Sequence, residues 1–213
     1  MSQNKKILLF DFDGVIVDTF ELAYGLHQDL EVKISPEEFR DLFMGNLYTS
    51  LKSARPQQDQ EQWAKKWFEL YKPKLLKTAI HPGMTETINQ LASDYQLTII
   101  SSAVSNIIEE YLKTQQLDHL FDLILGADVH LDKTEKIEMV LQKQQAQPAD
   151  CLFITDTVGD VLEAAKKQIQ SIAVTWGFHP PERFAANPPT AFANNPKELY
   201  QHINNYFNQN NGN

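Results

Sequence analysis

The chain has 213 residues, of which 42% are hydrophobic and 22% charged, values typical of a soluble globular protein. Its net charge of -9 and isoelectric point near 5.1 argue against nucleic acid or an anionic membrane as a partner. The single cysteine, Cys151, excludes an internal disulfide, and no apolar run approaches membrane-spanning length. The first apolar run is too short for a signal sequence, so we expect a cytoplasmic protein.

The first predicted strand, residues 7–10, is followed by two aspartates. Asp11 and Asp13 come after four apolar residues, a pattern typical of a strand buried on both faces in a parallel sheet. Because strand residues alternate sides, both carboxylates are expected on one side, at the edge where open α/β sheets bind ligands. Gly14 then allows the backbone to turn. A carboxylate can attack phosphorus when a cation neutralises the phosphate, and a second carboxyl can protonate the leaving oxygen.

The next sixty residues have a helical pattern with no strand signal. Residues 35–38 begin a helix, with serine as N-cap, proline at the first position and a glutamate that completes a capping box. Further on, four side chains spaced by four, three and four residues indicate one face of a long amphipathic helix: Trp63, Trp67, Leu70 and Lys74. We therefore predict an α/β core from residues 1–18 and 81–213, with an inserted helical cap domain at residues 19–80.

From residue 81 onwards, strands and helices alternate. The predicted strands are residues 97–100, 123–125, 151–154 and 172–175, and the helices between them are residues 104–115, 134–145 and 158–167. This alternation predicts an α/β fold, a Rossmann-like doubly wound parallel sheet with helices on both faces. We expect a loop at residues 178–195, a last helix at residues 196–206 and disorder at residues 209–213.

Polar side chains also follow two of the later strands. Ser101 comes directly after residues 97–100, where a hydroxyl and the N–H groups of a helix start suit a phosphate oxygen. A serine in this place is more often a helix cap. Asp156 and Asp160 follow the strand at residues 151–154, one at its tip and the other one helical turn further. Mg²⁺ prefers oxygen ligands and keeps several waters, so these few carboxylates are enough for a magnesium site.

These motifs resemble those of the haloacid dehalogenase (HAD) superfamily. Residues 11–19, Asp-Phe-Asp-Gly-Val-Ile-Val-Asp-Thr, match its opening motif DxDG[TV]hhD[ST] in full. Ser101 matches the second motif, and residues 132–136 contain the lysine of the third. Asp156 and Asp160 match the fourth, in which this chain has Thr155 where glycine is common. The chain is therefore identified as similar to HAD phosphohydrolases with a helical cap, of the phosphoglycolate phosphatase and β-phosphoglucomutase-like kind.

The resemblance implies a Mg²⁺-dependent phosphatase that hydrolyses a small phosphorylated metabolite through an aspartyl-phosphate intermediate. In this reading Asp11 is the nucleophile, and Asp13 is the general acid and base. The Asp11 carboxylate, the Asp13 backbone carbonyl and Asp156 hold Mg²⁺. Asp160 supports the site, either through a water on the metal or by orienting the loop.

The resemblance also implies residues that bind the phosphate. These are Ser101, Ser102 and a lysine at the start of the helix that precedes the last motif. Lys133 is the preferred lysine because it lies at the junction between loop and helix. Lys136 remains a substitute, because many relatives have Lys-Pro here and this chain does not.

Four other functions share parts of this pattern. A phosphomutase of the β-phosphoglucomutase type has the same core motifs, and a binding or regulatory protein could keep the fold without turnover. A haloacid dehalogenase needs neither a second acid nor a metal, so Asp13 and Asp156 argue against it. A phosphonate hydrolase needs a cap lysine, and nothing distinguishes one among Lys52, Lys65 and Lys66. The sequence leaves open whether the substrate is phosphoglycolate, a sugar phosphate or a nucleotide, and we expect a monomer or weak homodimer.

Overall fold

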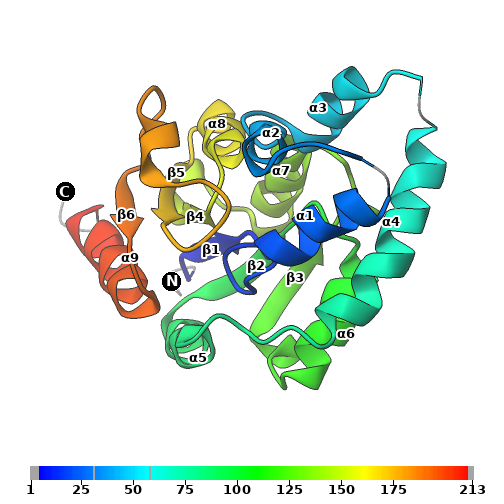
Figure 1. Ribbon diagram of the computed structural model, residues 1–213. Helices are drawn as coiled ribbons and strands as arrows, with labels where there is room; N and C mark the ends of the chain where they lie inside the picture. The colour runs from blue at the N-terminus through cyan, green and yellow to red at the C-terminus, as the bar shows by residue number, and fades with distance from the viewer. Residues whose placement is uncertain (1–4, 31, 58, 211–213) are drawn as a thin grey trace.

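A six-stranded parallel sheet forms the centre of the computed structural model, which describes residues 5–30, 32–57 and 59–210 (Figure 1). Its strands are β1 (Ile7–Phe10), β2 (Gln96–Ile100), β3 (Phe121–Leu125), β4 (Cys151–Thr155), β5 (Gln170–Val174) and β6 (Ala191–Ala193). The strand order is β3-β2-β1-β4-β5-β6, and each neighbouring pair is parallel. This is the order of a Rossmann-like doubly wound sheet, so the predicted fold class is confirmed.

Helices cover both faces of this sheet (Figure 1). On one face lie α5 (Met84–Asp94), α6 (Ser105–Thr114) and α9 (Pro196–Asn210), and on the other lie α7 (Lys133–Gln144) and α8 (Val158–Lys166). Leu8 and Phe10 pack in the first of these two cores, and Ile7 and Leu9 pack in the second. Alternate side chains of β1 therefore point to opposite cores, which explains the continuous apolar run in the sequence.

Four further helices form a layer beside the carboxyl ends of the strands. They are α1 (Phe20–Asp29), α2 (Pro36–Asp41), α3 (Leu47–Ala54) and α4 (Gln60–Leu75), shown from blue to cyan in Figure 1. The capping box predicted at Ser35 is present: the Glu38 N–H donates to Ser35 Oγ (3.2 Å), and the Ser35 N–H donates to Glu38 Oε2 (2.8 Å). The chain enters and leaves this layer side by side, because Val17 and Ile80 form an antiparallel bridge. The division into core and cap at residues 19–80 remains a prediction.

Four segments between the predicted elements differ from the prediction. The sequence analysis does not predict α5, which begins directly after Gly83 and buries Ile88 and Leu91. The expected loop at residues 178–195 contains a short 3-10 helix, Pro181–Phe184, and the edge strand β6. Other short 3-10 turns are Asp118–Leu120 and Pro148–Asp150.

The end of the chain also differs from the prediction. Helix α9 continues to Asn210 because Ile203 and Phe207 are buried against the sheet, so the disorder expected at residues 209 and 210 is wrong. Residues 211–213 lie outside the described part of the chain. Strand β6 has a sequence too short and too rich in alanine to predict, and it forms by pairing with the free edge of β5.

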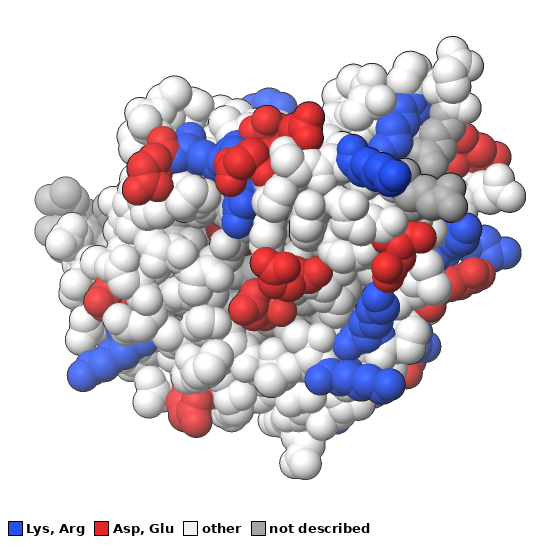
Figure 2. Space-filling view, in the orientation of Figure 1, with Lys and Arg blue, Asp and Glu red and all other residues white. Residues whose placement is uncertain are grey.

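The surface carries both signs of charge. On the face drawn in Figure 2, acidic and basic side chains occur in small groups, and no broad basic area is visible. Nucleic acids bind a clustered basic surface, which this face does not provide. No helix in the described ranges has the length and apolar character needed to cross a membrane. The predicted absence of nucleic-acid and membrane partners, the cytoplasmic location and the oligomeric state remain predictions.

Candidate active site

The candidate residues meet where β1 and β4 end side by side. Phe10 pairs with Ile154, and the Asp11 N–H continues the ladder by donating to the Ile154 carbonyl at 2.9 Å. Asp11 and Asp156 thus follow neighbouring strands at the point where the strand order reverses. In doubly wound sheets this is the edge that binds ligands.

Two glycines bring backbone close to Asp156. Gly14 has a φ of +74°, a conformation that side chains disfavour, and a Cβ atom there would collide with the Asp156 carboxylate. A Cβ atom on Gly177 would also collide with Asp156. The Phe178 N–H donates to Asp156 Oδ2 at 2.7 Å. The turn at Gly14 could be predicted from the sequence. The approach of Gly177 to Asp156 could not, because it depends on the path of the long loop after β5.

A buried ion-pair cluster lies at the centre of the site. Lys133 Nζ is 2.9 Å from Asp11 Oδ2 and 2.7 Å from Asp160 Oδ2, and all three side chains are buried. Burial raises the pKa of Asp11 well above its usual value, while Lys133 acts in the opposite direction. Although burial alone would lower it, the pKa of Lys133 is raised by Asp11 and Asp160. Burial acts to raise the pKa of Asp160, but the charge of Lys133 together with the hydrogen bonds from Asp11, Lys133 and Thr155 holds that pKa below its usual value.

The two candidate lysines lie on the same helix but have different partners. Lys136 is fully buried, and its Nζ donates to the Ser101 carbonyl at 2.6 Å. Burial and the charge of Lys133 lower the pKa of Lys136 to about 8. Lys133 alone of the two forms an ion pair with Asp11. The geometry therefore favours Lys133 for contact with a phosphate bound at Asp11.

Thr155, which stands where the family pattern commonly has glycine, makes two hydrogen bonds in the site. Its Oγ1 donates to Asp160 Oδ2 at 2.7 Å and accepts from the Thr157 N–H at 3.1 Å. Thr157 is the N-cap of α8, with its hydroxyl accepting from the Asp160 N–H. Thr155 thus holds the loop between β4 and α8 and orients the Asp160 carboxylate. The sequence analysis missed this contact, since it treats Thr155 only as a tolerated replacement for glycine.

The serine pair follows β2. Ser101 is fully buried, and its Oγ accepts from the Ala103 N–H at 3.0 Å. Ser102 and Ala103 line the pocket above the site, whereas Ser101 does not. The Tyr48 hydroxyl donates to the Ser102 carbonyl at 2.7 Å, which joins α3 to this loop. Ser102 therefore lies at the pocket surface, whereas the Ser101 hydroxyl is hydrogen-bonded within the turn.

Asp13 receives a hydrogen bond from the helical layer. The hydroxyl of Tyr71, on α4, donates to Asp13 Oδ1. Burial raises the pKa of Tyr71 well above its usual value, so this hydroxyl stays protonated. Burial also raises the pKa of Asp13, against the opposing effect of the Tyr71 hydrogen bond. Tyr71 was not predicted; its spacing of four from Trp67 on an amphipathic helix is the one signal that places it on the inner face.

Asp156 has the features of a metal ligand. Its Oδ1 is buried and has no hydrogen-bond partner among the described residues. Burial raises the pKa of Asp156 to about 8, which a cation at Oδ1 would reverse. No three histidine, cysteine or acidic side chains in the described ranges converge as a complete metal cage. Mg²⁺ needs only one or two carboxylates with waters and substrate oxygens, so Asp11, Asp156 and the Asp13 carbonyl fit it.

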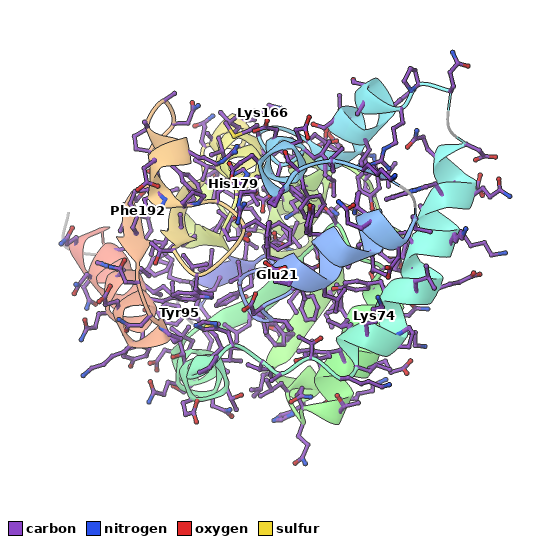
Figure 3. The ribbon with its side chains drawn as sticks, in the orientation of Figure 1. Glu21, Lys74, Tyr95, Lys166, His179 and Phe192 are labelled. Atoms are coloured by element: carbon purple, nitrogen blue, oxygen red, sulfur yellow. The ribbon has the colours of Figure 1, made fainter. Side chains whose placement is uncertain are left out.

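A pocket of about 90 Å³ lies between these residues and the helical layer. Its lining includes Glu163, on α8, whose Oε1 accepts from Asn46 Nδ2 (3.0 Å) and from the Lys133 N–H (3.3 Å). His179, labelled in Figure 3, also bridges core and layer: its Nδ1 accepts from the Val158 N–H, and its Nε2 donates to the Arg40 carbonyl. These contacts close the helical layer over the site.

Replacing Glu163 by glutamine is expected to flatten the dependence of stability on pH. Burial and the nearby Asp160 raise the pKa of Glu163 from 4.5 to about 7. The folded state therefore keeps a proton on Glu163 that the unfolded state loses. The contribution of this proton to the free energy of unfolding disappears as pH rises from about 4.5 to about 7. Glutamine keeps an Oε1 acceptor for Asn46 without a charge. Urea unfolding is expected to show the variant gaining up to about 3 kcal/mol on wild type between about pH 5 and pH 8. If the two proteins differed in free energy of unfolding by the same amount at every pH, the raised pKa of Glu163 would be contradicted.

Comparison with known proteins gives concordant matches. The sequence profile of the family described as Haloacid dehalogenase-like hydrolase matches residues 8–174. The phosphoglycolate phosphatase of Synechococcus elongatus is 26% identical over 95% of this chain and 99% of its own length. The pyrophosphatase PpaX of Listeria monocytogenes is 27% identical over 84% of this chain and 87% of its own. The structure of a haloacid dehalogenase-like hydrolase from Streptococcus pneumoniae superposes with a TM-score of 0.76 at 24% identity, covering 94% of this chain and 99% of that one.

Proposed function

This chain belongs to the haloacid dehalogenase-like hydrolase family, and on that basis we propose that it is a Mg²⁺-dependent phosphatase acting on a small phosphorylated metabolite. The relatives named phosphoglycolate phosphatase and pyrophosphatase support phosphate ester or anhydride hydrolysis. The observation that carries the proposal is the buried ion pair of Asp11 and Lys133 on the floor of the pocket. It pairs a carboxylate able to attack phosphorus with a cation able to bind the phosphoryl oxygens.

Asp11 is the proposed nucleophile. Its carboxylate forms a bond to phosphorus as the bond from phosphorus to the alcohol oxygen breaks, which gives an aspartyl-phosphate. Lys133 favours the ionised form of Asp11 in spite of burial, and its Nζ can stabilise the charge on the transferring group. Asp160 and Thr155 fix the position of that Nζ. Water then attacks phosphorus, which releases inorganic phosphate and restores Asp11.

Asp13 is the proposed general acid and base. Its raised pKa favours the protonated form, which an acid must have before the alcohol leaves. Oδ1 already accepts from the Tyr71 hydroxyl, so Oδ2 is the atom that carries the proton. After the alcohol has left, the same oxygen takes a proton from the attacking water.

Mg²⁺ fits the remaining oxygen atoms. The Asp11 carboxylate, the Asp156 carboxylate and the Asp13 backbone carbonyl would hold it, and Oδ1 of Asp156 would gain the partner that it lacks among the described residues. The ion supplies positive charge for the phosphate oxygens when bound. Ser102 is proposed to bind a further phosphate oxygen.

Residues 19–80 are proposed to act as a cap that excludes bulk water. Tyr48, on α3, and Tyr71, on α4, donate to the core at Ser102 and Asp13. The connections on either side of the Val17–Ile80 bridge form a natural hinge next to the site. Opening there would admit substrate, and closure would bring Tyr71 to the acid that protonates the leaving group.

The direct test is release of inorganic phosphate from small phosphoesters and acetyl phosphate by the full-length chain. We expect hydrolysis with Mg²⁺ and its loss when EDTA is added. After turnover in H₂¹⁸O, mass spectrometry is expected to show no ¹⁸O in Asp11, because water attacks phosphorus rather than carbon. Metal-independent hydrolysis, or ¹⁸O in the Asp11 peptide, would falsify this mechanism.

Replacing Lys133 by methionine is expected to lower kcat/KM by about 10²-fold or more, because a cation aimed at the phosphoryl oxygens is lost. The matched variant Lys136→Met removes a charge of similar burial, three residues away on α7, and we expect a much smaller loss. Steady-state kinetics with acetyl phosphate compare the two, and thermal unfolding checks that both fold. A larger loss for Lys136→Met would transfer the phosphate-binding role to Lys136.

A further inference from the structure

The pocket above the site has its charged side chains on one side only. They lie on the core floor, at the strand ends, at the start of α7 and on α8: Asp11, Asp13, Lys133, Asp156, Asp160 and Glu163. Five of these six are acidic. Lys133, the one cation among the described lining residues, is already paired with Asp11 and Asp160.

The cap side of the pocket is largely aromatic, and three of its polar atoms have no hydrogen-bond partner among the described residues: His27 Nε2, Trp63 Nε1 and Trp67 Nε1. Its main lining side chains are Phe39, Phe43, Leu47, Leu51, Trp63 and Trp67. His27 also lines it, but burial lowers the pKa of His27 to about 4, so the ring is neutral. The Tyr48 hydroxyl is directed to the Ser102 carbonyl. No described residue that lines this side carries a charge at neutral pH.

Two arginines of the cap lie beside residues that line the pocket, Arg40 at Phe178 and Arg55 at Trp63. Arg40 Nε donates to the Phe178 carbonyl at 2.8 Å, and Arg40 Nη1 pairs with Glu37 Oε1 at 3.0 Å. The Arg55 guanidinium lies over the Trp63 ring, 4.9 Å from its centroid. Neither arginine lines the pocket. A second anionic group on a substrate would therefore have no arginine among the described residues that line the pocket.

We infer that the leaving group is a small, uncharged alcohol, an inference that rests on the proposed phosphatase function. The floor binds the phosphoryl group, so the rest of the substrate contacts the cap wall. A carboxylate or second phosphate at that wall would lose hydration without a cationic side chain among the lining residues to pair with it. An apolar group gains by leaving water. The pocket of about 90 Å³ is smaller than the engineered cavity of about 150 Å³ that binds benzene, which favours a compact group.

The test compares isobutyl phosphate with 2-phosphoglycolate. Both esters have the same branched arrangement of heavy atoms, with two methyl groups in one where the other has two carboxylate oxygens. Glycolate is the better leaving group, so a preference for isobutyl phosphate cannot come from leaving-group chemistry. With saturating Mg²⁺ and the full-length chain, we expect kcat/KM for isobutyl phosphate to be higher by about tenfold or more.

A cap variant tests whether the lack of a cation among the lining residues causes the preference for isobutyl phosphate. Ala64, on α4, lines the pocket and makes no contact assigned to the chemistry. Ala64→Arg is expected to raise kcat/KM for 2-phosphoglycolate relative to isobutyl phosphate by about tenfold. Ala64→Gln adds a long polar side chain without charge and is expected to leave the ratio of the two kcat/KM values unchanged. An equal change of ratio in both variants would show that size rather than charge determines the preference.

Acetyl phosphate separates this inference from the function on which it rests. If acetyl phosphate is hydrolysed and 2-phosphoglycolate is cleaved as well as isobutyl phosphate or better, the inference is overturned while the phosphatase assignment stands. If acetyl phosphate is not hydrolysed with Mg²⁺ present, the proposed function fails and the inference fails with it.

Discussion

Replacing Asp11 by asparagine is expected to abolish Mg²⁺-dependent phosphate release, with a loss of about 10³-fold or more. The change removes the carboxylate proposed to attack phosphorus and one negative charge from the proposed metal site. Oδ1 of asparagine can still accept from the Phe12 N–H, which donates to Asp11 at 2.7 Å, so the turn after β1 is retained. Phosphate release from acetyl phosphate measures the effect.

The control for this variant is its stability. Lys133 loses Asp11 as a partner but keeps Asp160, so the variant is expected to fold. Thermal unfolding and circular dichroism check this directly. A folded variant with activity within tenfold of wild type would exclude Asp11 as the nucleophile.

Replacing Asp13 by asparagine is expected to slow turnover by about 10²–10⁴-fold while leaving Mg²⁺ binding nearly unchanged. The backbone carbonyl proposed to bind the metal is kept, and the Tyr71 hydroxyl retains an acceptor in the asparagine Oδ1. What is lost is the proton for the leaving oxygen. The loss is expected to be smaller for nitrophenyl phosphate, whose leaving group needs little protonation, than for an alkyl phosphate.

Tyr71→Phe provides a matched control for the role of Asp13. It removes the hydrogen bond but keeps a ring that can stack on Trp67, whose centroid is 4.6 Å away. Because that hydrogen bond lowers the pKa of Asp13, its removal is expected to raise this pKa and move the alkaline limb of the kcat profile to higher pH. Equal losses for nitrophenyl and alkyl phosphates in Asp13→Asn, with no pH shift in Tyr71→Phe, would argue against acid catalysis by Asp13.

The sequence by itself determined the sheet and one part of the site. The apolar run before Asp11 and the alternation of strands and helices were enough to predict the parallel sheet, because strand burial and helix periodicity are local patterns. Asp11 and Asp156 were predicted at the same edge, since the carboxyl ends of parallel strands meet there. The short strand β6 and the extension of α9 were not predictable in this way, because both depend on partners distant in sequence.

Only the tertiary structure decided the contacts between segments that are far apart in the chain. Lys133 and Lys136 look alike in sequence, yet packing of α7 directs one to Asp11 and the other to the Ser101 carbonyl. Tyr71 reaches Asp13 across 58 positions of the sequence, so no local pattern could assign it. The largely aromatic wall of the pocket likewise comes from several cap helices folded over one acidic floor. The sequence indicated which side chains could take part in the chemistry. The distances that bring these side chains together in one site are set by the tertiary structure.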